Sequence, residues 1–308
     1  SVRRQRQMCI RDSFNPMGIL IEVLFTFINF LTANPTSIEF EKIEREYYLF
    51  KPKYNVEPSP LIVNLHGYGS NALQQRIYTQ FNKFALPKNI YVVYPEGVNR
   101  SWNAGIDPNN TINDVGFINA LLDTIIANNN IDISRIYVCG FSNGGMMTNK
   151  LALELNDRFA AFGNVAGNLI LEEGQSIDFD RKIPMIHIHG TDDLWVPYQR
   201  KASRNRMDVD ESLEFWKNHN KLDQYSKEVI TTKSFFKKTS LNKIVFFNDN
   251  DSEKVVHYQV VGGGHQWFGS AYGSNILMKS YVGRNNTDFH ASEELINFFL
   301  NYKLENNE

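Results

Sequence analysis

Apolar runs and amphipathic segments alternate along the chain from Phe40 onward. Leu61–Leu65 is a run dominated by apolar residues. Such runs are typical of strands that are buried on both faces of a parallel sheet. The other segments of this kind are short and end in turn residues, as strands do. The predicted strands are Glu44–Pro52, Leu61–Leu65, Asn89–Gly97, the start of Arg135–Leu155, Lys182–Asp193 and Lys254–His265.

Helical patterns fill the intervals between these strands. Asp114–Asn129 has apolar residues at helical spacing and an aspartate at its start, where a negative charge favours a helix. The predicted helices are Asn71–Phe84, Asp114–Asn129, the end of Arg135–Leu155, Glu211–Leu222 and Ala291–Leu304. Strands separated by helices imply βαβ units. We therefore expect a mostly parallel central sheet with helices on both faces. Arg200–Asp210 is highly polar and is expected to be a surface loop.

The N-terminal segment differs from the rest of the chain. Residues 1–16 are basic and have no continuing periodicity, so we expect a non-native or disordered leader. Met17–Ala33 is apolar and is followed by polar residues, which predicts a secretory signal cleaved after Ala33 and export from the cell or to the periplasm. The run is short and contains Glu22, so we expect no stable membrane anchor. An apolar helix packed on the domain is the alternative. Residues 34–308 are expected to form a single α/β domain.

Composition narrows the class of function. The 32 basic and 34 acidic residues give a net charge of −2, without the basic excess typical of nucleic-acid binding. The two cysteines, Cys9 and Cys139, do not suggest a disulfide framework. Cys139 lies in an apolar run, where a buried thiol is the ordinary case. No spacing of Cys or His indicates a metal site, and we expect neither metal nor organic cofactor.

The strongest motif is Gly140-Phe141-Ser142-Asn143-Gly144, which follows a predicted strand and precedes a predicted helix. This G-x-S-x-G arrangement places a serine on a sharp turn, with its hydroxyl projecting from the sheet. The flanking glycines let the neighbouring backbone pack without a Cβ clash. Ser142 is therefore the candidate nucleophile, and the N–H of Asn143 is a candidate donor to an oxyanion.

A second motif, His66-Gly67-Tyr68-Gly69, directly follows the predicted strand Leu61–Leu65. A His-Gly loop after an early strand supplies a second oxyanion donor in lipase-like enzymes. We assign that role to the backbone N–H of Tyr68. The side chain of His66 is expected to be structural and to form hydrogen bonds with the loop backbone.

The acid and the base of such an enzyme follow later strands. Asp192 and Asp193 lie just after a predicted strand, and the pattern does not choose between them. His265 follows a strand end and three consecutive glycines, which let its imidazole reach back over the sheet. His187 and His189 are expected to be core or hinge residues; His219, His257 and His290 also have ordinary structural explanations. The order Ser, Asp, His predicts the α/β-hydrolase fold.

The motifs together resemble one group of enzymes: polyhydroxybutyrate depolymerases, feruloyl esterases and acetylxylan esterases of the carbohydrate esterase family 1 type. The resemblance runs from Leu61 to Gly269. The segments that carry it are LHGYGSN, YPEGVNRSWNAG, DVGFINALLDTI, RIYVCGFSNGGMMTNKLALELNDRFAAFGNVAGN, IHIHGTDDLWVPY and GGGHQWFG.

The resemblance implies a catalytic triad of Ser142, His265 and Asp193, because Asp193 matches the acid of a pattern like HGTxDxxVPY. It also suggests Trp102 and Trp267 as residues that line the substrate cleft, with core packing as the alternative for both. The sequence departs from the pattern at Phe268, where a proline is usual, and this puts the shape of that loop in doubt. Disulfides of some relatives are absent.

We therefore expect a serine esterase that acts on an ester substrate, which can be polymeric, such as feruloylated or acetylated polysaccharide or polyhydroxyalkanoate. Two alternatives remain: a serine peptidase of the same fold, and a non-catalytic relative that binds glycans. Relatives of the second kind usually lack a triad residue, whereas all three candidates are present here. Substrate choice is expected to depend on the loops 195–210 and 269–286.

Overall fold

A computed structural model describes most of the chain and divides it into two compact units, 1–35 and 36–308. Of the first unit it describes only Asn34 and Pro35, so the predicted leader and secretory signal lie outside the described residues. The described residues are 34–54, 57–171, 177, 179–199, 206–230, 239–249, 254–274 and 281–305.

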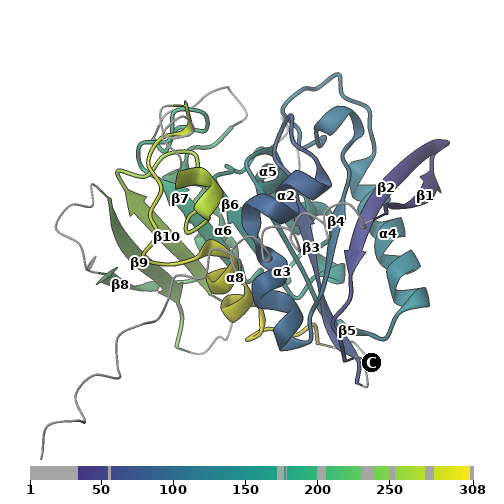
Figure 1. The fold of residues 1–308 in the computed structure, drawn as a ribbon. Helices are drawn as coiled ribbons and strands as arrows, with labels where there is room; N and C mark the ends of the chain where they lie inside the picture. Colours follow the sequence, from purple (N-terminus) through teal and green to yellow (C-terminus); the bar gives the residue numbers. More distant parts are fainter. Residues whose placement is uncertain are drawn as a thin grey trace, which may run out of the picture. The chain divides into compact units, whose positions relative to one another are not determined.

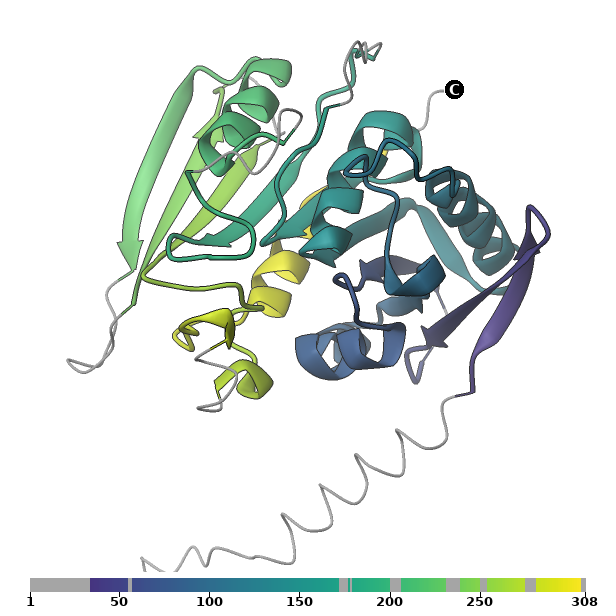
Figure 2. The same ribbon diagram turned by 90° about the horizontal axis from the view of Figure 1, so that it is seen from above.

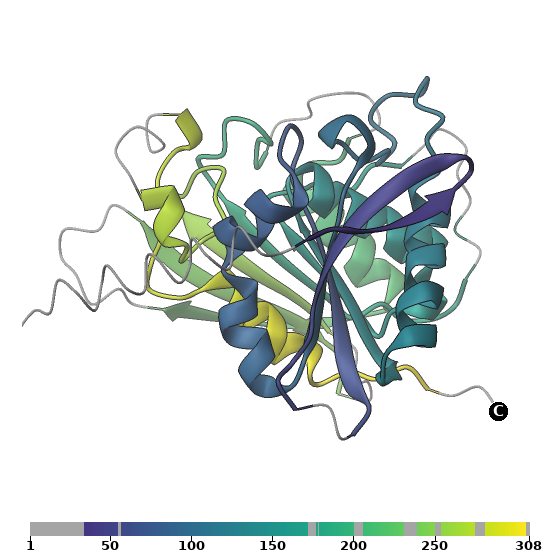
Figure 3. The same ribbon diagram turned by 45° about the vertical axis from the view of Figure 1, so that its right-hand side comes forward.

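The second unit is built on a sheet in the order β1-β2-β4-β3-β5-β6-β7-β10-β9-β8 (Figure 1). The six strands from β4 to β10 in that order pair in parallel, and the strands at both edges pair antiparallel. Figure 3 shows the hairpin of β1 and β2 at one edge. The strands are β1 (Thr36–Phe40), β2 (Ile43–Phe50), β3 (Ser59–Leu65), β4 (Tyr91–Pro95), β5 (Ile131–Phe141), β6 (Ala161–Val165), β7 (Met185–Gly190), β8 (Gln224–Ile230), β9 (Ser240–Phe247) and β10 (Val255–Val261).

Helices cover both faces of this sheet, as Figure 2 shows from above. One face carries α4, α5 and α6, and the other carries α2, α3 and α8; each set encloses its own apolar core against the strands. The central strands β3, β4, β6 and β7 are buried along their whole length, as expected for a sheet covered on both faces. The helices are α2 (Ala72–Thr79), α3 (Phe81–Ala85), α4 (Asp114–Asn128), α5 (Asn143–Glu154), α6 (Val209–His219) and α8 (Ala291–Phe299).

The predicted mostly parallel sheet with helices on both faces is confirmed, and three local predictions were wrong. The helix expected over Asn71–Phe84 is two helices, because Gln80 adopts a left-handed backbone with φ of 51°. Val209 and Asp210, expected in a polar loop, begin α6, whose N-terminus is capped by the side chain of Asp208. Four strands, β1, β6, β8 and β9, were not predicted.

Candidate active site

Ser142 stands on a strained turn between β5 and α5. Its backbone φ of 55° and ψ of −116° lie outside the regions that a residue with a side chain normally adopts. The flanking glycines make the turn sterically feasible: a Cβ on Gly140 would lie 2.2 Å from the carbonyl oxygen of Gly144, and a Cβ on Gly144 would lie 2.4 Å from that of Leu65. Both contacts are with backbone, which cannot move aside. The glycine requirement predicted from the motif is confirmed.

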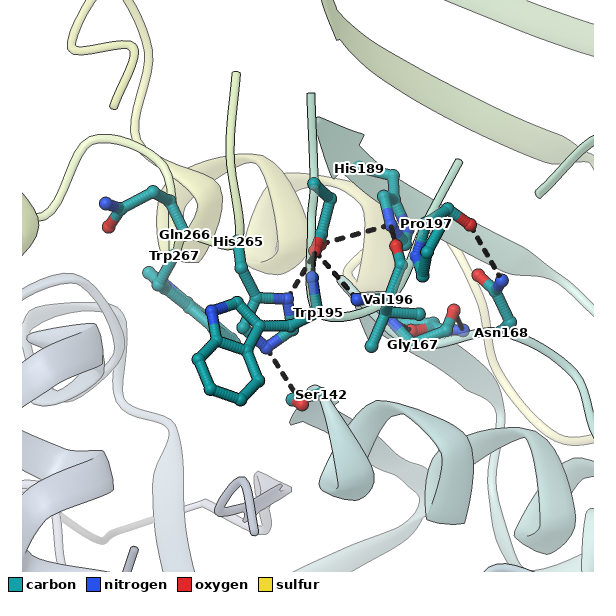
Figure 4. A network of polar contacts seen from close by, with 12 residues as sticks. Ser142, Gly167, Asn168, His189, Trp195, Val196, Pro197, His265, Gln266 and Trp267 are labelled. Atoms are coloured by element: carbon teal, nitrogen blue, oxygen red, sulfur yellow. Dashed lines mark hydrogen bonds and ion pairs between the residues drawn. The ribbon is translucent and has the colours of Figure 1, made fainter. Parts of the chain in front are cut away.

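The structure brings Ser142, His265 and Asp193 together from the ends of three strands (Figure 4). The Ser142 Oγ lies 2.9 Å from the His265 Nε2, and the His265 Nδ1 lies 2.7 Å from the Asp193 Oδ2. These are hydrogen-bond distances in a continuous line from hydroxyl to carboxylate. The imidazole of His265 also packs against the ring of Phe141, with ring centroids 4.8 Å apart, which fixes its plane.

The carboxylate of Asp193 is fully buried and is held by four groups. Its Oδ1 accepts hydrogen bonds from the backbone N–H of Trp195 at 2.9 Å and of Val196 at 2.8 Å. Its Oδ2 faces the His265 Nδ1 and also the His189 Nε2, which lies at 3.3 Å. Burial alone would raise the pKa of this carboxyl, but the hydrogen bonds from His189 and His265 hold the pKa well below its usual range. The group is therefore ionised at neutral pH.

The neighbouring Asp192 has a different environment. Its side chain is 57% exposed and lies 3.6 Å from the guanidinium of Arg284 at the surface. The structure thus distinguishes the two aspartates that the pattern left open: Asp193 contacts the imidazole of His265, and Asp192 does not.

The loop after β3 lies directly against the nucleophile. A Cβ on Gly67 would lie 3.5 Å from the Ser142 Cβ, which is van der Waals contact, and 3.1 Å from the ring of Phe141, which would have to shift slightly. Among the described residues, no acceptor contacts the backbone N–H of Tyr68 or of Asn143. The backbone N–H groups of Tyr68 and Asn143 stay the candidate donors to an oxyanion at Ser142.

His66 holds this loop in place, as the sequence analysis expected. Its Nε2 accepts a hydrogen bond from the Gly97 N–H at 2.9 Å, so its Nδ1 carries the proton and donates to the Gly67 carbonyl oxygen, also at 2.9 Å. Burial lowers the pKa of this imidazole to about 4, which keeps it neutral. The prediction of a structural role for the side chain is confirmed.

Trp102 also helps to hold this loop, through hydrogen bonds to the His66 backbone and to the side chain of Asn143. The indole Nε1 of Trp102 donates to the His66 carbonyl oxygen at 2.9 Å, and the backbone N–H of Trp102 donates to the Asn143 Oδ1 at 2.7 Å. Trp102 is only 2% exposed, although its edge forms part of the pocket wall. The suggestion that it binds substrate is therefore secondary to its structural contacts.

Trp267 does not line the pocket, and the suggestion that it does was wrong. It is fully buried, its Nε1 donates to the Ser292 Oγ at 3.0 Å, and it packs edge-on against Phe81. Phe268, which replaces the usual proline, is also buried in the core.

A pocket of about 800 Å³ opens above the triad. Exposed aromatic side chains stand at its wall: Tyr68 is 79% exposed, Trp195 51% and Tyr281 63%. The rings of Trp195 and Tyr281 lie 4.9 Å apart, and the Trp195 Nε1 donates to the Tyr281 carbonyl oxygen. The motifs gave no signal for these three side chains, because exposed aromatic residues in loops have no fixed spacing. The two loops expected to set substrate choice also line the pocket. Their described parts contribute Trp195, Arg206 and Tyr281.

The described residues contain no group of three or more His, Cys, Asp or Glu that could hold a metal ion. The arrangement has candidates for the parts that acyl transfer needs: a nucleophile, a base that contacts it, an acid that contacts the base, and two backbone donors.

The sequence matches the model of a known protein family. Residues 53–210, just over half of the sequence, match the model of a family described as phospholipase/carboxylesterase. The chain belongs to this family. It is therefore a carboxylesterase-family hydrolase of the α/β-hydrolase fold. The resemblance to feruloyl esterases, acetylxylan esterases and polyhydroxybutyrate depolymerases is confirmed by the relatives below.

Three curated relatives are similar to this chain in sequence. NocK of Nocardia uniformis subsp. tsuyamanensis, which is named as an esterase, is 26% identical over 79% of this chain and 75% of its own length. Feruloyl esterase B of Neurospora crassa is 34% identical over 44% of this chain and 46% of its own length. Poly(3-hydroxyalkanoate) depolymerase C of Paucimonas lemoignei is 32% identical over 35% of this chain. The match spans less than half of each of the last two proteins.

A solved structure shows the same fold. An acetyl xylan esterase from Aspergillus awamori superposes with a TM-score of 0.58 and 16% sequence identity, over 76% of this chain and 94% of that one. At this identity the likeness concerns the fold alone.

Proposed function

We propose that this protein is a serine esterase that hydrolyses carboxylic esters through an acyl-enzyme intermediate. One observation carries the proposal: the hydroxyl of Ser142, the imidazole of His265 and the carboxylate of Asp193 form one hydrogen-bonded line at the floor of an open pocket. In a carboxylesterase-family hydrolase, that line is the arrangement needed to activate a serine.

In the first half of the reaction, the His265 Nε2 takes the proton of the Ser142 Oγ as that oxygen attacks the ester carbonyl carbon. The carbonyl oxygen becomes an oxyanion, which accepts hydrogen bonds from the N–H groups of Tyr68 and Asn143. Each such donor contributes about 3 kcal/mol in the transition state. His265 then gives its proton to the leaving alcohol oxygen, and the acyl group stays on Ser142.

In the second half, water replaces the alcohol. His265 takes a proton from the water, the resulting hydroxide attacks the acyl carbonyl, and the proton passes to the Ser142 Oγ as it leaves. Throughout, Asp193 accepts the Nδ1–H of His265, which keeps the Nε2 free to accept a proton and stabilises the imidazolium that forms.

For the substrate, we propose feruloyl or acetyl esters of polysaccharide, with polyhydroxyalkanoate as the alternative. The pocket volume suits a ligand of several rings, and exposed aromatic faces stack on phenyl or sugar rings. Trp195 and Tyr281 present such faces beside the triad. Relatives named as feruloyl esterases and as a poly(3-hydroxyalkanoate) depolymerase support both candidates.

We also propose that the protein is exported, on the apolar run Met17–Ala33 and the polar residues that follow it. Throughout the described part of the chain, no helix has the length and apolarity needed to cross a bilayer.

The esterase proposal is tested with p-nitrophenyl acetate and butyrate on the purified protein and on Ser142→Ala. We expect kcat/KM to fall by a factor of about 10⁴ or more, and a fluorophosphonate probe to label the parent protein alone. Equal rates for the two proteins would end the proposal. Faster turnover of peptide nitroanilides than of esters would favour a peptidase instead.

The substrate proposal needs a panel of methyl ferulate, acetylated xylan and short-chain polyhydroxybutyrate, each with the parent protein and with Trp195→Ala. We expect Trp195→Ala to raise KM for the feruloyl ester about fivefold and to leave p-nitrophenyl acetate unchanged, because only the larger acyl group reaches the indole. Tyr225→Ala is the matched control, since Tyr225 is an exposed aromatic residue on β8 that does not line the pocket. Preference for the polyhydroxybutyrate would select the alternative.

A further inference from the structure

A row of buried side chains lies behind Asp193, on the side away from His265. His187 and His189 are two residues apart on β7, so both point to the same face of the sheet. The parallel register pairs His257 of β10 with His187. Tyr198, from the loop after β7, completes what we call the histidine row: His189, His187, His257 and Tyr198, each no more than 5% exposed.

The members of the histidine row are in sequential contact. The His189 Nδ1 lies 3.4 Å from the His187 Nε2, the His187 Nδ1 lies 3.1 Å from the His257 Nδ1, and the His257 Nε2 lies 2.8 Å from the Tyr198 hydroxyl. At the near end the His189 Nε2 lies 3.3 Å from the Asp193 Oδ2. At the far end the Gln259 side-chain amide donates to the Tyr198 hydroxyl at 3.0 Å.

Backbone carbonyl groups fix which nitrogen of each imidazole carries the proton, because a carbonyl oxygen only accepts. The His189 Nε2 faces the Val196 carbonyl oxygen at 2.8 Å, so it carries a proton. The His187 Nε2 faces the Gly167 carbonyl oxygen at 3.1 Å, and the His257 Nδ1 faces the His187 carbonyl oxygen at 3.2 Å, so both carry protons too.

These three assignments orient the whole row. With one nitrogen of each ring protonated, the other is an acceptor, and it faces a donor in every case: His187 donates to His189, His257 to His187, and Tyr198 to His257. A second proton on His189 or His187 would set two N–H groups head to head, and a second proton on His257 would require the Tyr198 hydroxyl to turn from donor to acceptor. Consistently, burial lowers the pKa of His187 well below its usual range and that of His257 to about 3. The rings of His187 and His257 are therefore neutral.

We propose that the histidine row is a one-directional chain of hydrogen bonds whose last N–H, on the His189 Nε2, is shared between the Val196 carbonyl oxygen and Asp193, and that this chain keeps the buried carboxylate ionised and fixed in place. This inference rests on the proposed function, in which Asp193 orients His265. The four side chains are positioning residues, since none of them touches the substrate.

The surroundings of Asp193 explain why such support matters. A buried carboxylate without donors takes up a proton, and it then no longer holds the imidazole of His265. Among the described residues, the titratable groups that act on Asp193 are His189, His265 and, at longer range, the hydroxyl of Tyr78. No cation of Lys or Arg contacts it in the described residues, so neutral dipoles and His265 supply the stabilisation.

The direct test is the tautomer of each ring, read from long-range ¹H–¹⁵N correlation spectra of protein labelled with ¹⁵N-histidine at pH 7. We expect His187 and His189 to carry the proton on Nε2 and His257 to carry it on Nδ1, all three neutral. Assignment comes from single His→Gln variants. The opposite tautomer, or a cation, at any of the three would overturn the proposal.

Kinetics test the link to Asp193. Tyr198→Phe keeps the ring and removes the hydroxyl that donates to the His257 Nε2. We expect kcat/KM to fall about fivefold. On the acidic side of the pH profile, the pH at which kcat/KM is half of its maximum should rise by about half a unit. The reason is that a carboxylate with weaker hydrogen-bond support is more basic and stabilises the imidazolium of His265 more strongly. Tyr137→Phe is the matched control: it removes a buried hydroxyl that donates to the Tyr302 carbonyl oxygen, away from the site, and should leave that pH unchanged.

A second pair of variants acts at the near end of the row. His189→Leu removes the N–H that faces Asp193, and it should raise the pH of half-maximal kcat/KM on the acidic side of the profile. His189→Gln offers an N–H at a similar position and should return that pH to the value of the parent protein. Loss of activity without a change in that pH in Tyr198→Phe or His189→Leu would overturn the proposal. An inactive parent protein would refute the esterase function, and the tautomer spectrum would still decide the inference on the row.

Discussion

The two halves of the active site are held in place by different means. On the nucleophile side, backbone packing dominates: the turn at Ser142 and the loop after β3 approach each other through glycines, and one neutral histidine, His66, secures the loop. On the acid side, side chains dominate: Asp193 is held by two backbone N–H groups and by the histidine row. The difference shows that one candidate site can combine close backbone packing with buried polar support.

The largest effect is expected on the acid side, from Asp193→Asn. The amide keeps the shape of the carboxylate but cannot accept the Nδ1–H of His265 in the same way, so the imidazole loses its working tautomer. We expect kcat on p-nitrophenyl butyrate to fall by a factor of about 10⁴.

Asp192→Asn is the control for that substitution. Its carboxylate is exposed, and its ion pair with Arg284 is a surface contact. We expect less than about a twofold change in kcat, since exposed pairs contribute little. Comparable losses in both variants would mean that the acid was assigned to the wrong carboxylate or to neither.

On the nucleophile side, Gly144→Ala tests the steric argument. Its Cβ would lie 2.4 Å from the Leu65 carbonyl oxygen and 2.6 Å from that of His66, so the turn and the loop must separate. We expect kcat to fall about a hundredfold, as it does when one oxyanion donor is lost, and the unfolding free energy to fall by about 2 kcal/mol.

Gly67→Ala provides the graded comparison. Its Cβ would lie 3.1 Å from the nearest atom, in the ring of Phe141, which can shift slightly. Urea unfolding should therefore show a smaller loss of stability than for Gly144→Ala. Equal stability of the Gly144→Ala variant and the parent protein would refute the steric account.

The most gradual effect concerns stability against pH. The pKa of His66 in the folded protein is about 4, below the value near 6.5 of an exposed imidazole. As pH falls from 6.5 to 4, the unfolded chain therefore binds a proton that the folded chain does not. This lowers the unfolding free energy by up to about 1.4 kcal/mol per pH unit for each such histidine. Above pH 6.5 the loss is absent.

Urea unfolding of the parent protein and of His66→Gln at pH 7, 6 and 5 checks this. The glutamine amide oxygen can still accept the Gly97 N–H, so the variant should fold. Its stability should fall less steeply with decreasing pH, by about 1.4 kcal/mol per unit. Identical slopes would show that His66 is protonated in the folded state or is already neutral in the unfolded chain. The remaining slope should come mainly from the acid side, where His187 and His257 are also held neutral.

The same contrast explains what the sequence could predict. The nucleophile turn is a local motif whose glycines and serine are adjacent in the chain, so both its residues and its shape follow from five letters. The acid side depends on register. His187 and His257 meet only because β7 pairs with β10 in one alignment, 70 residues apart, and no single-sequence pattern specifies that alignment.

Other parts were missed for equally physical reasons. β8 lies at the edge of the sheet, and its side chains are mostly exposed, so it lacks the apolar run that marks the central strands. Trp102 and Trp267 have similar motif contexts, yet one reaches the pocket wall and the other is enclosed by Phe81 and Ser292. Burial of this kind depends on how the chain turns after His265, which the sequence does not reveal.

The spacing of the three central residues along the chain has a consequence for how activity is acquired. Ser142 and His265 are 123 residues apart, and β10 must join the sheet beside β7 before they can meet. Contacts between distant parts of a chain form late, because the intervening segment must first be ordered. Recovery of turnover after dilution from denaturant should therefore lag behind the return of the helical circular-dichroism signal. The time course of turnover would then report when β10 pairs with β7.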